Sequence, residues 1–431
     1  MKNLFKNLKL RRRGITMLAG MHFFGNPSEK LKIIGVTGTN GKTTTVTLLY
    51  RIALGLGYKA GLISTVENLI NGEEMSATYN TPSTTPDPIF LNKLLNEMLK
   101  QGCKYVFMEV SSHALDQDRV AGVNFAGGIF TNLTQDHLDY HKSMEKYFLA
   151  KKNFFKMLPK RAFALSNTDD EYGEKMLKEI VACKFSYGFE SEAPARNASS
   201  IADAGGDFKG QISKLDFKGL ELDFNSKNFL TRRQVQSKLL GKFNAYNLLA
   251  VWSACMLLHF DIDKVDKILE NIEAPAGRFQ PFMTPDGVLA IVDYAHTPDA
   301  LENVLQAIKT SFAGSKIISV FGCGGDRDPL KRPIMGKLGA TLSDIAIFTS
   351  DNPRGEDPDK IIAEMKKDLS SELSVKVKTI PNRLEAISEA TKIAKKGDII
   401  LVAGKGHEDY QEIKGVKKHF DDMEELRKAY E

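Results

Sequence analysis

The stretch Gly-Val-Thr-Gly-Thr-Asn-Gly-Lys-Thr-Thr-Thr at residues 35–45 constrains the fold more than any other part of the chain. The apolar run at residues 31–36 predicts a buried strand, and residues 43–56 predict a helix. A glycine-rich turn between strand and helix exposes N–H groups at a helix N-terminus, an arrangement typical of polyphosphate binding. Val36 stands where the full Walker pattern has its first glycine, so Gly-x-x-Gly-Lys-Thr at residues 38–43 remains.

This turn predicts a nucleotide site in which Lys42 supplies a positive charge and Thr43 a hydroxyl for Mg²⁺. The alternative is an ordinary glycine turn, which would not need a lysine and a hydroxyl at these offsets. The residues expected to surround the phosphates are Gly38, Thr39, Asn40, Gly41, Lys42, Thr43 and Thr44.

Composition and charge limit the class of protein. With 431 residues and 42% hydrophobic residues, the chain should form two or three domains with substantial cores. Its net charge of +5 is modest and is not gathered into a basic stripe with aromatics, which argues against nucleic acid binding and suits small anionic substrates. No apolar run reaches the roughly 18 residues of a membrane span, so we expect no membrane insertion. Four cysteines without C-x-x-C spacing indicate reduced thiols and a cytoplasmic protein.

The pattern along the chain predicts α/β domains. After the P-loop, apolar strands at residues 59–65, 104–110 and 127–133 alternate with helices, as in a doubly wound parallel sheet. Residues 208–240 alternate like antiparallel strands, and a second series of strands and helices covers residues 288–403. The expected divisions are a short basic segment at 1–30, a central P-loop domain at 31–280 and a C-terminal Rossmann-like α/β domain at 281–431.

Two polar residues follow predicted strands of the central domain. Functional loops in such sheets follow the carboxyl ends of the strands, which places Glu109 and His137 near a bound triphosphate. Together they could hold a divalent ion, for which a carboxylate is an ordinary ligand and a histidine a less usual one. Each also has a simpler interpretation, Glu109 as a strand-end acid and His137 as a neighbour of the helix cap at Asp136.

Charged residues follow several predicted strands of the C-terminal domain as well. Arg327 comes after a glycine-rich strand end, Arg354 comes after Pro353, and Glu408 ends a further strand. Two arginines and two acids at one sheet edge predict a pocket for a zwitterion with carboxylates and amines. Taken singly, each of these residues could equally be a solvated loop charge.

In these motifs the chain resembles the Mur ligase family, the ATP-dependent amide-forming enzymes of peptidoglycan precursor synthesis. The resemblance covers residues 31–431 and rests on several motifs in family order. They are Gly38-Thr-Asn-Gly-Lys-Thr-Thr44, Glu109-Val-Ser-Ser-His-Ala-Leu115, Asp136-His-Leu-Asp139, Phe243-Asn-Ala-Tyr-Asn247, Gly277-Arg-Phe279, Asp293-Tyr-Ala-His-Thr-Pro298 and Gly404-Lys-Gly-His-Glu408.

Within the family, residues 351–354 resemble the signature of the diaminopimelate-adding type; lysine-adding relatives lack its arginine. Diaminopimelate differs from lysine by a second carboxylate, which a guanidinium can recognise. The resemblance implies that the amino acid is held by Arg327, Asp351, Asn352, Pro353, Arg354, Gly404 and Glu408.

The resemblance also implies the remaining site residues. Lys151 would be carbamylated and would join the metal ligands, which are then Thr43, Glu109, His137 and Lys151; the catalytic residues are Lys42, Glu109, His137 and Lys151. Contacts to the rest of ATP would come from Asn244, Asn247, Arg278 and Asp293. The UDP-muramoyl dipeptide would contact Ser83, Thr84, Thr85, Ser111, Gln117 and Arg119.

The implied reaction uses ATP and Mg²⁺ to join meso-diaminopimelate to the D-glutamate γ-carboxylate of UDP-N-acetylmuramoyl-L-alanyl-D-glutamate through an acyl phosphate. We expect a cytoplasmic monomer. The family has a uridine-binding domain ahead of the P-loop, and here about thirty residues precede the first predicted strand. Either this domain is short, replaced or missing, or the sequence begins late. The alternatives are a lysine-adding Mur ligase, a folylpolyglutamate synthase, or a nucleotide-binding protein derived from a ligase without catalysis.

Overall fold

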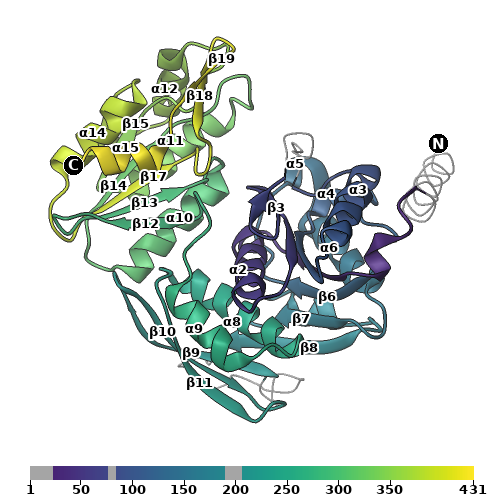
Figure 1. Ribbon diagram of the computed structural model, residues 1–431. Helices are drawn as coiled ribbons and strands as arrows, with labels where there is room; N and C mark the ends of the chain where they lie inside the picture. The colour runs from purple at the N-terminus through teal and green to yellow at the C-terminus, as the bar shows by residue number, and fades with distance from the viewer. Residues whose placement is uncertain (1–22, 76–83, 190–205) are drawn as a thin grey trace. The chain divides into compact units, whose positions relative to one another are not determined.

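The computed structural model describes residues 23–75, 84–189 and 206–431 and divides the chain into two compact units (Figure 1). The first unit takes in the described residues up to 214 together with 220–238 and 243–272. The second takes in 215–219, 239–242 and 273–431. Ser83, which the sequence assigns to the dipeptide, lies outside the described residues.

Within the described residues, the first unit contains an 11-stranded sheet in the order β11-β10-β9-β8-β7-β6-β1-β5-β2-β3-β4. Strand β1 lies between β5 and β6 and runs parallel to both. Pairing is parallel from β9 to β2, and β3, β4 and the β10–β11 pair are antiparallel to their neighbours. The strands are β1 (Lys32–Thr37), β2 (Ala60–Ile63), β3 (Asn68–Ile70), β4 (Glu73–Glu74), β5 (Tyr105–Glu109), β6 (Phe125–Phe130), β7 (Phe163–Asn167), β8 (Cys183–Phe189), β9 (Phe208–Asp216), β10 (Gly219–Ser226) and β11 (Thr231–Ser237).

Helices cover both faces of the parallel part of this sheet, which explains why its strands are continuous apolar runs. Ile33, Ile34 and Val36 of β1 are fully buried. The helices are η2 (Pro27–Glu29), α2 (Lys42–Gly55), α3 (Pro88–Lys100), α4 (Ser112–Asp116), α5 (Leu138–His141), α6 (Met144–Met157), α7 (Gly173–Leu177), α8 (Lys242–Leu257) and α9 (Ile262–Asn271).

Helix α6 packs against two glycines of the sheet. Gly35 of β1 and Gly128 of β6 are neighbours in register. A Cβ atom at Gly35 would lie 2.6 Å from the ring of Phe154, and one at Gly128 would lie 2.9 Å from the same ring. The absence of side chains at both positions therefore lets α6 approach the sheet closely.

The second unit contains, in its described residues, a six-stranded sheet in the order β12-β13-β17-β14-β15-β16 and a separate two-stranded sheet of β18 and β19. All pairings of the larger sheet are parallel except β12 with β13. The strands are β12 (Gln280–Met283), β13 (Leu289–Asp293), β14 (Ile317–Phe321), β15 (Ile345–Phe348), β16 (Val377–Thr379), β17 (Ile399–Ala403), β18 (Tyr410–Ile413) and β19 (Val416–His419).

Two apolar clusters fill the two faces of this sheet. Alternate residues of one strand enter different clusters: Leu289 and Ile291 belong to one, Ala290 and Val292 to the other. The helices are α10 (Pro298–Ser311), α11 (Lys331–Leu342), α12 (Pro358–Lys366), α13 (Ser371–Ser374), α14 (Arg383–Ile393) and α15 (Asp422–Lys428).

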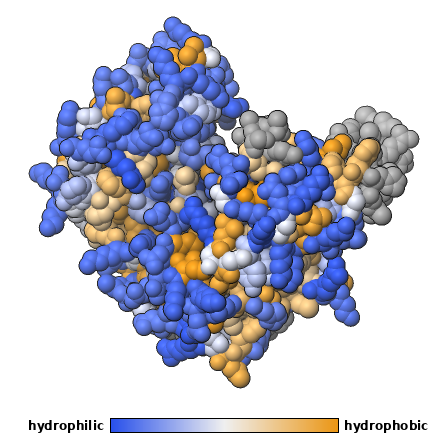
Figure 2. Space-filling model, viewed as in Figure 1, coloured by the Kyte–Doolittle hydropathy of each residue, from blue (hydrophilic) through white to orange (hydrophobic). Residues whose placement is uncertain are grey.

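The predicted α/β class with parallel sheets is confirmed. The strand expected at 127–133 is β6, which ends at Phe130 because the following residues turn toward the P-loop. The antiparallel pattern predicted for 208–240 holds for β10 and β11, whereas β9 pairs with β8 in parallel. Hydrophilic residues cover most of the surface seen in Figure 2. No helix in the described residues is long and apolar enough to cross a membrane.

Candidate functional site

The P-loop joins β1 to α2 and needs glycine at two positions. Gly41 caps α2 in the left-handed region, with φ 84°, and a Cβ there would lie 2.4 Å from Oδ1 of Asn247. A Cβ at Gly38 would lie 1.9 Å from Oγ1 of Thr131. Backbone from this loop can therefore approach a phosphate closely, and the α2 N-terminus favours the anion.

The loop after β6 holds the P-loop in shape. The Thr39 N–H donates to the Asn132 main-chain oxygen at 2.9 Å, and the Asn40 N–H donates to Oδ1 of Asn132 at 2.9 Å. Oγ1 of Thr131 donates to the Asn40 oxygen at 2.6 Å. The sequence predicts a functional loop at 131–137 because it follows a strand, but it does not predict these contacts of Thr131 and Asn132 with the P-loop.

Lys42, Thr43 and Glu109 come together at the start of α2. Nζ of Lys42 donates to the main-chain oxygens of Gly38 at 3.0 Å and Thr39 at 2.7 Å. Oγ1 of Thr43 donates to Oε1 of the buried Glu109 at 2.9 Å. A hydroxyl and a carboxylate this close are oxygen donors of the kind that Mg²⁺ prefers, so these two residues fit the ion.

Lys151 lies beneath the same loop. Its side chain is 1% exposed, and Nζ donates to the Gly38 oxygen at 2.6 Å and lies 4.5 Å from the ring centre of Tyr147. Burial lowers the pKa of Lys151 well below its usual range, and the charge of Lys42 lowers it further. Both effects favour the uncharged, nucleophilic amine, which is the form that can react with CO₂.

The adjacent Lys152 has a different environment. Its ammonium donates to main-chain oxygens at the C-terminal end of α7, including that of Met176 at 2.8 Å. Carbonyls at a helix C-terminus suit a cation. Of the two lysines, only Lys151 contacts the P-loop in the described residues.

His137 begins α5 with a left-handed backbone, φ 53°. Its ring Nε2 lies 3.4 Å from Oδ2 of Asp136, and its ring centre lies 4.8 Å from that of His113. Burial lowers the pKa of His137; Asp136 opposes this, while His113, Lys42 and Lys151 add to it. The imidazole is thus neutral near pH 7, as a metal ligand must be.

The described residues contain no group of three or more His, Cys, Asp and Glu side chains able to hold a metal ion. The predicted metal site accordingly includes the Thr43 hydroxyl and a carbamylated Lys151 in addition to Glu109 and His137. The sequence-predicted ligands lie around the P-loop in this arrangement, and their role stays a prediction.

The residues predicted for the dipeptide form one hydrogen-bonded group beside Glu109. Oγ1 of Thr85 donates to the Glu109 oxygen at 2.9 Å and accepts from the Ser111 N–H at 3.0 Å. Arg119 donates from Nη1 to the Thr85 oxygen at 2.9 Å and from Nε to Gln117 Oε1 at 2.8 Å. Thr84 accepts a hydrogen bond of 3.0 Å from Oγ1 of Thr65, whose N–H donates to Oε1 of Glu109 at 2.8 Å.

Helix α8 contributes the two predicted asparagines. Nδ2 of Asn247 donates to Oδ1 of Asn244 at 3.0 Å, and both side chains are buried. The contact between Asn247 and the Gly41 backbone links α8 directly to the P-loop.

In the second unit, Asp293 at the end of β13 binds the backbone of two turns. Its Oδ2 accepts from the Phe279 N–H at 2.7 Å and its Oδ1 from the Ala295 N–H at 2.9 Å. Burial raises the pKa of Asp293, and the nearby charge of Arg278 opposes this. The guanidinium of Arg278 lies 5.0 Å from the ring centre of Tyr294. The structure thus brings Arg278 and Asp293 together.

The predicted amino-acid residues gather at the carboxyl ends of β14, β15 and β17. Asn352 donates from Nδ2 to Oε2 of Glu408 at 2.7 Å, and a Cβ at Gly404 would lie 2.7 Å from Oδ2 of Asp351. Nη1 of Arg354 donates to the Gly325 oxygen at 2.8 Å.

Arg327 extends from the same edge and is exposed. A Cβ at Gly324 would lie 2.9 Å from Nη1 of Arg354 and 3.7 Å from Cγ of Arg327, so both arginines flank this glycine. Gly325 packs against Pro353, since a Cβ added at Gly325 would lie 2.0 Å from the Pro353 main-chain oxygen.

Lys405 is a site residue that the sequence did not indicate. Its side chain is fully buried, its Nζ lies 3.6 Å from Oε2 of Glu408, and it also donates to the main-chain oxygen of Tyr410. Burial raises the pKa of Glu408, as does the charge of Asp351, while Lys405 lowers it. This sheet edge thus carries acidic groups, and the buried Lys405 offsets the charge of Glu408.

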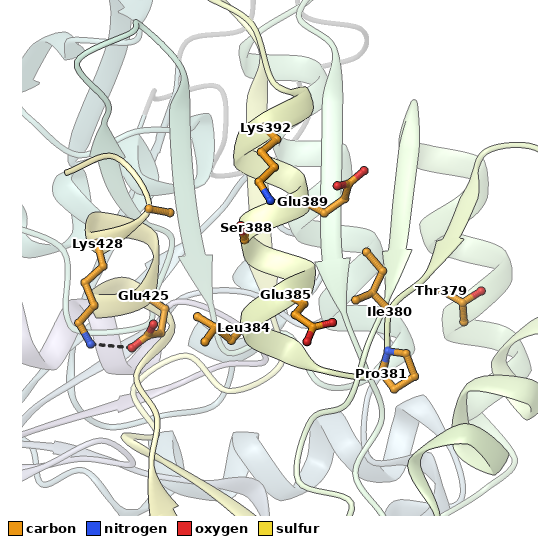
Figure 3. A pocket seen from close by; sticks show the side chains of 11 residues that line it. Thr379, Ile380, Pro381, Leu384, Glu385, Ser388, Glu389, Lys392, Glu425 and Lys428 are labelled. Atoms are coloured by element: carbon orange, nitrogen blue, oxygen red, sulfur yellow. Dashed lines mark hydrogen bonds and ion pairs between the residues drawn. The ribbon is translucent and has the colours of Figure 1, made fainter.

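A separate open groove lies between α14 and α15, where Leu384, Ser388 and Lys392 face Glu425 and Lys428 (Figure 3). None of the sequence-predicted site residues lines it.

Comparison with known proteins places both units in one family. Residues 36–255 match the Mur ligase middle domain, and residues 277–406 match the Mur ligase glutamate ligase domain. A protein of Bacteroides fragilis, UDP-N-acetylmuramoyl-L-alanyl-D-glutamate--2,6-diaminopimelate ligase, is 51% identical over 413 residues, which cover 96% of this chain and 80% of that protein. A Clostridium botulinum protein of the same name is 43% identical, covering 94% of this chain and 78% of that protein.

A solved structure with that name has 33% identity and a TM-score of 0.67, covering 96% of this chain and 82% of the other. Folylpolyglutamate synthase of Thermotoga maritima shares the fold with a TM-score of 0.67 at 16% identity, covering 92% and 90% of the two chains.

Proposed function

The chain belongs to the Mur ligase family. We propose that it joins 2,6-diaminopimelate to UDP-N-acetylmuramoyl-L-alanyl-D-glutamate in peptidoglycan precursor synthesis. The observation that carries the proposal is the gathering of Arg354, Arg327 and Glu408 at one sheet edge of the second unit. Guanidinium groups suit the two carboxylates of diaminopimelate, and an acidic group suits an ammonium.

The reaction proceeds by activation of a carboxylate. The γ-phosphoryl group of ATP passes to the γ-carboxylate of the D-glutamate residue, which gives an acyl phosphate and ADP. The amine of diaminopimelate attacks the acyl carbon, the amide C–N bond forms, and phosphate leaves with the bonding electrons while the amine loses a proton.

The first unit supplies the groups for phosphoryl transfer. Lys42 and the P-loop N–H groups hold the phosphates, and Thr43 and Glu109 are the residues that would hold Mg²⁺. When bound there, the ion would reduce the repulsion between the phosphate and the carboxylate. Asn244 and Asn247 would contact the nucleotide, and the hydrogen-bonded group of Thr84, Thr85, Ser111, Gln117 and Arg119 would bind the dipeptide acceptor.

Lys151 would act after carbamylation. Its uncharged amine attacks CO₂, a C–N bond forms, and a proton is released to water, leaving an anionic oxygen ligand beside His137. Mass spectrometry under ¹³CO₂ with chemical trapping should find the added carboxyl group on Lys151 and leave Lys152 unmodified. Label on Lys152 alone, or on neither lysine, would refute this assignment.

Phosphate release tests the function. We expect release that requires the UDP-muramoyl dipeptide and meso-diaminopimelate together. With lysine or ornithine, kcat/KM should be at least about a hundredfold lower, because these amino acids lack the distal carboxylate and leave the guanidinium without a partner. Equal rates with lysine would indicate a lysine-adding ligase. Nucleotide binding without phosphate release, whichever amino acid is offered, would indicate a non-catalytic derivative.

Two variants test which substrate each residue binds. Arg354→Ala should raise KM for diaminopimelate without changing KM for ATP, whereas Lys42→Ala should abolish turnover and leave the fold intact. Arg161→Ala, an exposed arginine of the first unit, is the matched control. Retained turnover in Lys42→Ala would contradict the P-loop assignment.

A further inference from the structure

The hairpin of β18 and β19 stands apart from the six-stranded sheet of the second unit. Its strands pair Ile413 with Val416 and Glu412 with Lys417, and the two residues between them, Lys414 and Gly415, have φ of 49° and 77°. Two consecutive positive φ values are typical of the type I′ turn that closes tight hairpins. The hairpin is therefore closed by its own turn, and one edge of β18 is not paired with β19.

That edge binds the loop that carries Arg354. The Arg354 N–H donates to the Glu412 oxygen at 3.0 Å, and the Lys414 N–H donates to the Arg354 oxygen at 2.7 Å. The Glu412 N–H donates to Oδ1 of Asn352 at 2.9 Å, and Arg354 forms a parallel bridge with Ile413. The loop thus adds a short third strand to the hairpin.

The hairpin also reaches the guanidinium. Arg354 has a left-handed backbone, φ 49°, which a residue with a long side chain adopts only where its surroundings hold it there. Nη1 donates to the Gly325 oxygen at 2.8 Å, and Nε lies 3.7 Å from Oε2 of Glu412. Within the described residues Nη1 and Nε have these two partners, and Nη2 is the guanidinium nitrogen that is left for a ligand.

We propose that the β18–β19 hairpin is a specificity-determining element, in which Glu412 orients the Arg354 guanidinium toward the distal carboxylate of the amino-acid substrate. This inference rests on the proposed function. A guanidinium fixed before binding loses less rotational freedom when a carboxylate arrives. The Glu412 carboxylate also repels an acidic group that approaches Arg354 from the wrong side. Lysine, without a distal carboxylate, gains nothing from this arrangement.

Glu412→Ala tests the side chain. We expect KM for diaminopimelate to rise about threefold, the size of a partly exposed ion pair, with kcat and KM for ATP unchanged. Glu412→Gln keeps an oxygen acceptor for Nε and should recover part of the effect. Lys418→Ala, on the exposed strand of the same hairpin, is the matched control and should not change either KM.

A double-mutant cycle separates orientation of Arg354 from a general structural effect. If Glu412 acts through Arg354, adding Glu412→Ala to Arg354→Ala should cause no further rise in KM for diaminopimelate. Additive effects, or an equal rise in KM for ATP, would mean that Glu412 merely supports the fold and would overturn the proposal.

Gly415→Val tests the hairpin from a distance. Among the described residues, no atom lies within 4 Å of a Cβ added at Gly415, so the substitution acts by straining a turn that needs positive φ. KM for diaminopimelate should rise although the residue touches no ligand.

The outcomes distinguish this inference from the proposed function. If Arg354→Ala raises KM for diaminopimelate and neither Glu412→Ala nor Gly415→Val does, the hairpin proposal is overturned and the proposed function stands. If Arg354→Ala also leaves KM unchanged, both are overturned.

Discussion

The Nζ atom of Lys151 lies 2.6 Å from the main-chain oxygen of Gly38, which puts a buried amine directly beneath the P-loop. The next residue, Lys152, points away and binds the carbonyls that end α7. These two adjacent lysines of α6 therefore have different contacts, and substituting each one should affect a different property of the protein.

Lys151→Ala should lower kcat by at least about a hundredfold, because the anionic carbamate that would act on the transition state is lost. Lys152→Ala should keep most of the activity but lower the free energy of unfolding by about 1–3 kcal/mol, because buried carbonyls lose their donor. Steady-state kinetics and urea unfolding measure the two effects. The reverse pattern would contradict the assignment.

Gly41→Ala should abolish nucleotide binding. An added methyl group would lie 2.4 Å from Oδ1 of Asn247, and the backbone at φ 84° disfavours any side chain. Adding Asn247→Ala removes the clash but leaves the backbone strain and takes away a proposed nucleotide contact, so the double variant should bind ATP better than Gly41→Ala and more weakly than the unaltered protein. Calorimetric titration with ATP gives the dissociation constants; Gly57→Ala, at a positive φ with no neighbour within 4 Å, is the control.

Asp422→Ala should destabilise the second unit by about 3–5 kcal/mol, because it leaves a buried guanidinium without its counter-ion. Asp422 accepts two hydrogen bonds of 2.7 Å from Arg383, and both side chains are fully buried. Chemical unfolding followed by circular dichroism measures the loss. Glu424→Ala, an exposed position of the same helix, should leave the unfolding midpoint unchanged.

The stability of the chain should fall as the pH drops from about 6.5 toward 4, and His407 contributes to this. Burial lowers the pKa of His407 to about 4, and Arg278 adds to the effect. The unfolded chain therefore binds more protons than the folded one between pH 6.5 and 4, so the free energy of unfolding decreases with falling pH in that window and is unaffected by this group above it.

His407→Gln should flatten that part of the profile, measured by urea unfolding at pH 7.5 and pH 5. His259→Asn, an exposed histidine with a left-handed backbone at φ 57°, serves as the control. An unchanged slope in His407→Gln would show that the histidine is not protonated on unfolding in this range.

Much of the fold was predictable because its signals are local. The P-loop follows from glycines, a lysine and a hydroxyl at fixed offsets between an apolar run and a helix. The proximity of Asn352 to Glu408 follows from one rule, that parallel strands bring their carboxyl ends to a common edge. The position of Lys151 could not be predicted in this way, since a lysine on a helix carries no sign of burial, and only the resemblance singled it out.

The contacts that the sequence did not reveal join segments far apart in the chain. In the β18–β19 hairpin, β19 is exposed and β18 mostly half-buried, and its partner loop lies 60 residues earlier, at Asn352. Lys405 and Tyr147 are further cases, because their importance comes from burial beside charged or reactive groups. Tertiary packing decides such positions, and a single sequence does not contain it.

The close fit of Phe154 against Gly35 and Gly128 sets how deep α6 lies, and Lys151 is on the turn of α6 just before Phe154. The position of the Lys151 nitrogen relative to the P-loop thus depends on the absence of side chains at Gly35 and Gly128 in the middle of the sheet. Gly35 carries no functional group, yet replacing it with alanine would lift the helix and separate the amine from the P-loop. In a screen for lost activity, this position would be indistinguishable from a residue that touches the substrate.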